Sequence, residues 1–384
     1  MHESWLKNNK FSIIKYCILF FLQKTMKNKL TVAFPTRPNI QNIKWLLWSL
    51  DKQTFQDFKV IVLIDSKLTQ KEFDDLKNES INWFKRIKDR VKFISNVNSD
   101  FVPQKWVSYV RNYGIKLADT EFLNLFDDDE ILKPDYLEKS FEIYNVILNK
   151  VNNLSSLSRG KERSDRGILI PPSRLVGTPP LLREALDSSS LCSSEWQKQS
   201  KWEFVVVPKL MFRQTWQIQN EWFDYYNFWT SRPHSFHFKW EKFAQIQMFS
   251  GNSLFGPTKI FQEILFDERF DFVYEDLDFT YRIHKAWYPI FISSELEIYH
   301  MERDKTLLEN AWIGSEFQCY RKARHRMWFI KKNATKLQKI QFYLLWFWAQ
   351  PLRLIWKILL FAPVKDWKIL IWALIRGTVD WINN

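Results

Sequence analysis

Apolar residues between positions 29 and 150 fall into short runs separated by amphipathic stretches. The run at 60–64 is apolar throughout, as expected for a strand buried on both faces. The stretches between the runs repeat apolar residues at helical spacing. We therefore predict alternating strands and helices, forming an α/β fold with a mostly parallel sheet covered by helices. Four runs are predicted strands: 30–34, 60–64, 91–95 and 122–126.

The pattern changes after residue 150. Residues 150–245 begin rich in Ser, Arg, Pro and Gly and then become aromatic, so we predict a partly irregular insertion. Strands are expected again near 247–250 and 289–293, and helices beyond about 305. The predicted organisation is an N-terminal extension (1–28), an α/β domain (29–305) that contains the insertion, and a helical tail (306–384).

Charge separates the tail from the rest of the chain. The net charge is +13, but residues 321–384 hold 13 Lys and Arg against 2 Asp, so the first 320 residues carry only +2. A general nucleic-acid binder should carry its charge on the folded domain, so nucleic acid is not an expected partner. The three cysteines lie far apart, which argues against a cysteine-built zinc site and is typical of a reducing compartment.

The tail combines apolar helices with Trp, Lys and Arg, broken at Pro351 and Pro363. Such helices suit a membrane interface, where anionic lipids attract the basic residues. The alternative is a helical cap packed on the domain, with its basic residues in water. No uninterrupted apolar run of about 20 residues occurs, so no spanning helix is predicted. Residues 11–22 are predicted as an N-terminal amphipathic helix rather than a signal peptide.

Four consecutive acids, Asp127 to Glu130, follow the predicted strand 122–126. Ligands of such sheets bind beyond the carboxyl ends of the strands, where Asp65 is also expected. Adjacent carboxylates repel one another unless a cation is bound, and Mg²⁺ or Mn²⁺ prefers such oxygen ligands. Asp127 and Asp129 would face the same way in extended chain. The alternative is a solvated acidic turn that caps the helix at Pro134.

A second acidic cluster, Tyr274-Glu275-Asp276-Leu277-Asp278, reads either as an ordinary helix start or as the source of a general base. His300 ends a predicted strand and is either structural or a metal ligand. In combination and in order, these motifs make the chain resemble the family 2 glycosyltransferases of the GT-A fold. The matching segments are Pro35-Thr36, 60–66, 110–115, 124–135, 266–278 and Tyr299-His300.

The resemblance implies a GT-A catalytic domain at 29–305 and a role for each matching residue. Asp276 would be the base that deprotonates the acceptor hydroxyl, and Glu275 would help orient the acceptor. Mn²⁺ or Mg²⁺ would be held by Asp127, Asp129 and His300. Asp65 would contact the nucleotide base. The full set implied for the nucleotide-sugar is Pro35, Thr36, Asp65, Arg111, Asn112, Asp127 and Asp128.

The implied function is inverting transfer of a sugar from a UDP- or dTDP-sugar to a glycan or lipid-linked acceptor, for cell-surface polysaccharide synthesis. Trp367–Trp381 resembles the terminal segment of rhamnosyltransferase-like members, which suggests a cytoplasmic enzyme peripheral to the inner membrane face. The chain departs from the family at Arg37-Pro38-Asn39 and lacks the glycine expected after Asp65. Two alternatives are an inactive GT-A-like protein and a basic, aromatic module that binds a polymer or nucleic acid. A nucleotidyltransferase is disfavoured because no glycine-rich loop follows the first strand.

Overall fold

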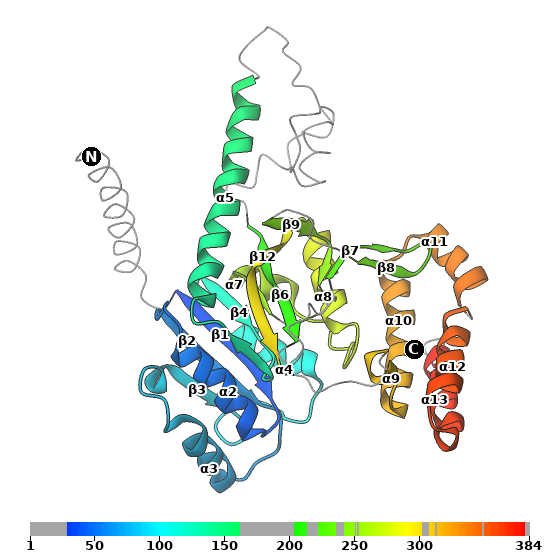
Figure 1. The fold of residues 1–384 in the computed structure, drawn as a ribbon, viewed down its shortest axis with the longest axis horizontal. Helices are drawn as coiled ribbons and strands as arrows, with labels where there is room; N and C mark the ends of the chain where they lie inside the picture. Colours follow the sequence, from blue (N-terminus) through cyan, green and yellow to red (C-terminus); the bar gives the residue numbers. More distant parts are fainter. Residues whose placement is uncertain are drawn as a thin grey trace, which may run out of the picture.

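The computed structural model describes residues 29–161, 203–212, 222–235, 242–301 except 250 and 252, and 307–380 except 312 and 348. The predicted N-terminal helix and the Ser- and Pro-rich part of the insertion lie outside the described residues. Figure 1 shows a twisted central sheet with flanking helices and, beside it, the helices of the tail.

The first half of the sheet is parallel, as the apolar runs predict, and its strand order is β3-β2-β1-β4. The side chains of these strands are almost all buried, and helices on the connections cover them. Asn39 and Thr69 cap two of the helices through their side chains. The elements are β1 (Leu30–Thr36), α2 (Ile40–Asp51), β2 (Phe58–Ile64), α3 (Gln70–Ile81), β3 (Val91–Ile94), α4 (Val107–Leu117) and β4 (Phe122–Leu125).

The second half of the sheet is mixed, so the prediction of a mostly parallel sheet is wrong there. β11 (Leu254–Pro257) runs antiparallel to β4 and to β6 (Val205–Phe212). β12 (Ile290–His300) is parallel to β6, and a register shift divides it between two antiparallel partners. Its first part pairs with β9 (Phe243–Ile246) and its last part with β5 (Glu130–Leu132).

Part of the predicted insertion therefore belongs to the sheet itself. β6 lies between β11 and β12, and its apolar start is buried in the main core. A small second sheet, of order β10-β7-β8, lies toward the tail (Figure 1). Its strands are β7 (Trp222–Asn227), β8 (Arg232–Ser235) and β10 (Met248–Phe249). Three helices complete the domain: α5 (Tyr136–Lys161), α7 (Thr258–Ile264) and α8 (Glu275–Lys285).

The tail is helical, as predicted. Pro363 lies between two helices, whereas Pro351 falls in the first turn of a helix, where its missing N–H costs nothing. The elements are α9 (Leu307–Asn310), α10 (Glu316–Asn333), α11 (Lys336–Gln341), the π-turn Phe342–Trp346, α12 (Ala349–Phe361), the 3₁₀ turn Val364–Asp366 and α13 (Trp367–Val379).

Helix α10 fastens the tail to the α/β domain by charge pairs. Arg321 Nε lies 2.7 Å from Asp271 Oδ1. Lys332 Nζ lies 2.6 Å from Asp267 Oδ2 and 2.8 Å from Asp278 Oδ2. Several basic residues of the tail thus face the domain rather than water, and α10 is a packed cap.

Helices α10 and α13 approach closely at Gly377. A Cβ atom added there would lie 2.3 Å from the backbone oxygen of Tyr320. We expect Gly377→Ala to lower stability by about 1–3 kcal/mol, because the clash with rigid backbone outweighs alanine's better helix propensity. Thermal unfolding followed by circular dichroism measures this. Val379→Ala, on the same helix but part-exposed, is the control, and a Gly377→Ala protein as stable as wild type would contradict the packing.

Candidate functional site

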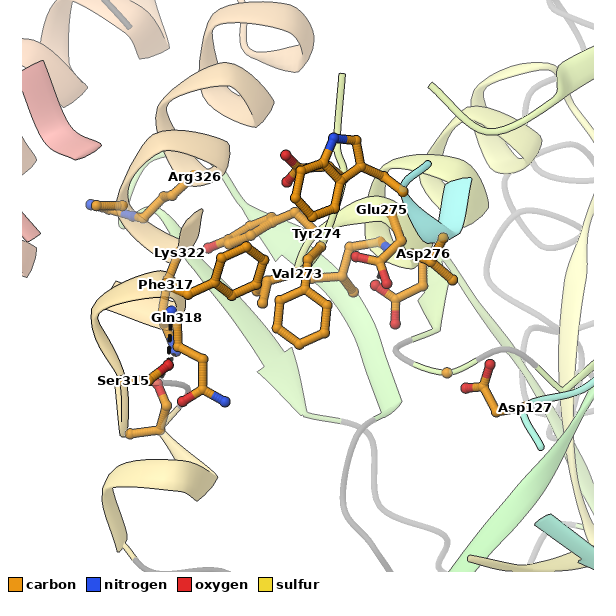
Figure 2. A pocket seen from close by; sticks show the side chains of 18 of the residues that line it. Asp127, Val273, Tyr274, Glu275, Asp276, Ser315, Phe317, Gln318, Lys322 and Arg326 are labelled. Atoms are coloured by element: carbon orange, nitrogen blue, oxygen red, sulfur yellow. Dashed lines mark hydrogen bonds between the residues drawn. The ribbon is translucent and has the colours of Figure 1, made fainter. Parts of the chain in front are cut away.

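A cleft of about 1130 Å³ runs from the carboxyl ends of β1 and β4 to helices α10 and α12. Figure 2 shows Asp127 at one end, Ser315, Gln318 and Lys322 of α10 at the other, and Tyr274 to Asp276 between them. Ten of the residues singled out in the sequence line this cleft: Pro35, Thr36, Asp65, Arg111, Asp127, Asp128, Asp129, Glu275, Asp276 and His300.

The carboxylates of the acidic run, Asp127 to Glu130, do not point in the same direction. Residues 128 and 129 form a turn between β4 and β5, so the expected strand alternation of Asp127 and Asp129 is wrong. Asp127 pairs with Arg111, Asp128 with Thr36, and Asp129 with His300. The turn thus sends three neighbouring carboxylates to three different partners and reduces their mutual repulsion.

Arg111 of α4 is 5% exposed and bridges two carboxylates. Its Nη2 lies 2.8 Å from Asp127 Oδ1, and its Nη1 lies 3.5 Å from Glu275 Oε1. Burial raises the pKa of Glu275, and the positive charge of Arg111 opposes that rise. The other oxygen, Glu275 Oε2, is buried without a hydrogen-bond partner in the described part of the chain. Arg111 therefore fixes the two acids relative to each other.

Asp128 is held by side chains from the end of β1 and the first turns of α2. Thr36 Oγ1 donates to Asp128 Oδ2 at 2.5 Å, and Asn42 Nδ2 lies 3.4 Å from Asp128 Oδ1. Burial raises the pKa of Asp128 to about 6, and the nearby Asp129 and Asp127 contribute. Asn42 was not singled out in the sequence, where it reads only as a polar position in an amphipathic helix.

Glu130 turns inward rather than toward the cation expected for the acidic run. It is 3% exposed, accepts a hydrogen bond from the Asp127 N–H at 3.1 Å and another from the Ser253 hydroxyl. Burial and the charge of Asp127 raise its pKa to about 8. Burial thus favours the protonated form of Glu130, which would carry no negative charge.

Asp65 lies at the carboxyl end of β2, as predicted, and its Oδ1 accepts from the Gln104 N–H at 2.6 Å. Burial raises its pKa. Asn112 is placed differently from its expected position in the nucleotide pocket. Its side chain binds the backbone of Phe266 through hydrogen bonds of 2.9 and 2.7 Å, and it is not among the described residues that line the cleft.

The second acidic cluster begins α8 after two residues with left-handed backbone, Val273 (φ 64°) and Tyr274 (φ 77°). This turn brings Glu275 and Asp276 to the cleft, where Asp276 Oδ1 accepts from the Leu277 N–H at 2.8 Å. Asp278 lies on the opposite side of the helix start, fully buried against Arg282 and Lys332. One acidic cluster thus serves both the cleft and the junction with α10.

His325 of α10 supports this turn from behind. Its Nδ1 lies 2.7 Å from the Phe272 carbonyl oxygen and 2.9 Å from that of Val273. Because both neighbours are carbonyl oxygens, Nδ1 is the donor, and Nε2 lies 3.2 Å from Asp271 Oδ1. Burial lowers the pKa of His325 to about 4. The sequence showed His325 only as part of a basic cluster, and its supporting role depends on tertiary contact.

His300 and Asp129 lie together where β12 meets β5, with His300 Nε2 3.1 Å from Asp129 Oδ2. Among the described residues, no three His, Cys, Asp or Glu side chains gather as a metal site. Asp127 turns one oxygen toward Arg111 instead. An imidazole and a carboxylate could together supply two ligands to a divalent ion, with other positions left for a substrate.

The wall opposite Asp127 is built by residues that the sequence assigned to the tail. Lys322 and Arg326 on α10, and Arg353 and Lys357 on α12, line the cleft. Each pair has a spacing of four, which places both members on one helical face. That spacing was visible in the sequence, but whether the face points to water or to a cleft was not.

Comparison with known proteins bears on the first part of the chain. Residues 31–146 match the model of the family described as glycosyl transferase family 2. Comparison with curated proteins gives no match. Among solved structures, Staphylococcus aureus TarS 1–349 in complex with UDP-GlcNAc is similar, with 16% identity, a TM-score of 0.44, and coverage of 92% of this chain and 83% of that one. A second TarS structure has 14% identity and a TM-score of 0.39, with coverage of 92% and 54%. The match to the glycosyl transferase family 2 model spans the strands, helices and acidic turn that form one end of the cleft.

Proposed function

We propose that the protein is an inverting glycosyltransferase that moves a sugar from a nucleotide-diphosphate donor to an acceptor hydroxyl. The observation that carries the proposal is the cleft, in which Arg111 links Asp127, inside the family-matched segment 31–146, to Glu275 beside Asp276. A GT-A enzyme needs a donor-binding side and a base for the acceptor within one cleft. Here the acidic turn at Asp127 supplies the donor side, and Asp276 beside Glu275 supplies the base.

In this proposal the nucleotide lies over the carboxyl ends of β1 and β2. Asp65, half-buried and anchored by Gln104, faces the base, and Pro35 and Thr36 form the floor. Arg111 and Asp128 complete the nucleotide-binding pocket. Asn112 acts indirectly, because its bonds to Phe266 fix the loop behind Arg111.

In this proposal Asp129 and His300 hold a Mn²⁺ or Mg²⁺ ion. Asp127 would become a third ligand only by turning toward the ion the oxygen that does not face Arg111, because no three such side chains gather in the described residues. When bound, such an ion would neutralise charge on the diphosphate of the donor. The protein's own contribution is to bring the acidic turn and His300 together, through the salt bridge to Arg111 and the β5–β12 pairing.

Asp276 would accept the proton of the acceptor hydroxyl while that oxygen attacks the anomeric carbon of the sugar. The bond from that carbon to the diphosphate oxygen breaks on the opposite face, its electron pair leaves with the nucleoside diphosphate, and the configuration inverts. The hydrogen bond from Leu277 N–H to Asp276 Oδ1 orients the carboxylate. Glu275, held by Arg111, shapes the acceptor side.

Measuring nucleotide binding identifies the base of the donor nucleotide. The same measurement tests the alternative that the protein is inactive. We expect one of UDP, dTDP, GDP, CMP and ADP to raise the melting temperature in the presence of Mn²⁺, because a ligand of the folded state stabilises it. Uridine and thymidine diphosphates are the favoured candidates. Asp129→Ala should weaken this metal-dependent binding at least about tenfold.

The control for that measurement is Asp75→Ala, an exposed acid on α3 outside the cleft. No shift with any nucleotide would favour the inactive or polymer-binding alternatives. A shift that persists unchanged in Asp129→Ala would remove Asp129 as a ligand.

Replacement of the proposed base separates chemistry from binding. Asp276→Asn keeps the shape of the side chain but cannot accept the proton, so transfer should fall about 100-fold or more while nucleotide affinity stays within about twofold. Product formation from the donor identified above, with Asp75→Asn as control, measures this. Turnover near that of wild type would exclude Asp276 as the base.

We also propose that the tail places the enzyme on the inner face of the cell membrane, next to a glycan or lipid-linked acceptor. Large apolar side chains are exposed on the tail, with Trp356 64% and Trp372 60% exposed. Others are Leu344, Leu345, Leu352, Leu360, Phe361, Val364 and Ile369. Interfacial helices bury such residues among lipid headgroups.

No single described helix is long and apolar enough to cross a membrane. One pair, Lys336–Leu345 and Ala349–Phe361, has the length and composition of a broken span, bent by 43°. The apolar exposure supports attachment at the surface, and the resemblance of the last helix to rhamnosyltransferase-like proteins supports a lipid-linked acceptor.

Co-sedimentation with phosphatidylglycerol vesicles tests the attachment. The double variant Trp356→Ser/Trp372→Ser should bind vesicles at least about tenfold more weakly, because two exposed indoles no longer enter the interface. Trp83→Ser, a 76% exposed indole on the α/β domain, is the matched control. Equal binding by the double variant and wild type would argue against attachment through this surface.

A further inference from the structure

Four basic side chains gather at the end of the cleft farthest from Asp127. Lys322 and Arg326 come from α10, and Arg353 and Lys357 come from α12. Arg326 is only 7% exposed, its Nη2 donates to Ser231 Oγ at 2.9 Å, and its guanidinium lies 4.9 Å from the Phe342 ring centre. Lys322 is half-buried and donates to the Ala311 carbonyl oxygen at 2.6 Å. These contacts fix two of the four cations in the wall.

Two other cations of α10 differ from this cluster in having acidic partners. Arg321 pairs with Asp271, and Lys332 pairs with Asp267 and Asp278. Within the part of the chain that the structure describes, no ion pair joins an acid to any of the four clustered side chains.

The cluster is electrostatically costly as it stands. Burial lowers the pKa of Lys322 to about 8, and the neighbouring charges of Lys357, Arg326 and Arg353 add to the effect. Four cations around one space favour a bound anion, because the anion would relieve their mutual repulsion. Arginine forks and a lysine ammonium together are typical of phosphate recognition.

The position of the cluster separates it from the proposed donor diphosphate. Figure 2 places Lys322 and Arg326 across the cleft from Asp127, with Asp276 between the two sides. A sugar donor held at the Asp127 side leaves the space between Asp276 and α10 for the acceptor. An acceptor whose hydroxyl reaches Asp276 would extend toward the basic wall.

We propose that the basic cluster of α10 and α12 binds a phosphoryl group of the acceptor. The acceptor is then a phosphate-bearing molecule, either soluble or membrane-borne. The cluster consists of Lys322, Arg326, Arg353 and Lys357. This inference rests on the proposed function, and it names the acceptor class of the same cleft. The cations would hold the acceptor's phosphate while a neighbouring hydroxyl lies at Asp276. The tail would thus contribute to acceptor choice as well as to attachment.

The test uses the full-length protein and two phosphate probes without added metal. Inorganic tripolyphosphate, titrated calorimetrically at fixed salt, reports soluble phosphate, and phosphatidylglycerol against phosphatidylcholine vesicles reports lipid phosphate. The double variant Arg353→Gln/Lys357→Gln removes the two more accessible charges. The control Lys71→Gln/Lys77→Gln makes the same charge change on exposed positions of α3, outside the cleft.

We expect the Arg353→Gln/Lys357→Gln variant to bind at least one phosphate probe at least about tenfold more weakly than wild type, with the control within about twofold. Loss in the tripolyphosphate arm assigns a soluble phosphate, and loss only in the vesicle arm assigns a lipid phosphate. Lys322→Gln, a second variant on the other helix, should weaken the same arm. Equal weakening by the cluster and control variants, or no cluster-specific weakening in either arm, would overturn the inference.

The failure of the inference is distinguishable from failure of the proposed function. Absence of nucleotide binding by wild-type protein with Mn²⁺ would count against the glycosyltransferase. Normal nucleotide binding combined with unaltered phosphate binding in the Arg353→Gln/Lys357→Gln variant would count against the acceptor assignment alone.

Discussion

The buried guanidinium of Arg111 is the interaction on which the cleft depends. It joins Asp127, which follows the fourth parallel strand, to Glu275, which begins a helix about 150 residues later in the chain. Arg111 is 5% exposed and Glu275 is buried, so Arg111 supplies a cation between two carboxylates that lie in the same cleft. A single residue of α4 thus links the two acidic clusters across the cleft.

The second constraint is the docking of α10 against the turn that precedes α8. His325 donates from Nδ1 to the carbonyl groups of Phe272 and Val273, and Lys332 ties Asp278 to the same helix. The left-handed residues Val273 and Tyr274 carry backbone strain that these contacts offset. Asp276 reaches the cleft from a turn that the tail supports, so the tail helps to build the site.

The basic side chains of the tail have different surroundings, depending on the part of the molecule that they face. Side chains of α10 that face the α/β domain meet Asp267, Asp271 and Asp278. The four that face the cleft meet no described acid, and the exposed apolar residues of α12 and α13 face outward. A count of charges along the sequence shows only one basic tail and does not separate these groups of side chains. The helical cap expected from the sequence is seen in α10, whereas membrane attachment through the exposed apolar side chains stays a proposal.

The sequence by itself determined the strand–helix alternation of the first half, since continuous apolar runs and capping residues act locally. It also determined which acids end β2, β4 and begin α8, because strand ends and helix starts follow from pattern. It could not determine that β6 enters the sheet from the predicted insertion or that β11 and β5 run antiparallel, because strand order depends on contacts far apart in the chain.

Nor could the sequence determine where side chains point after a strand ends. The turn at Asp128 and Asp129 replaces alternation with three separate partners, and Glu130 is drawn inward by Ser253, a residue more than 120 positions away. Asn112 looked like a ligand residue but binds backbone. The four cations of α10 and α12 had a readable spacing, yet only tertiary packing decided that their faces close one end of a cleft. Local pattern fixes the elements, whereas burial and long-range charge pairing decide which of their polar residues form the site.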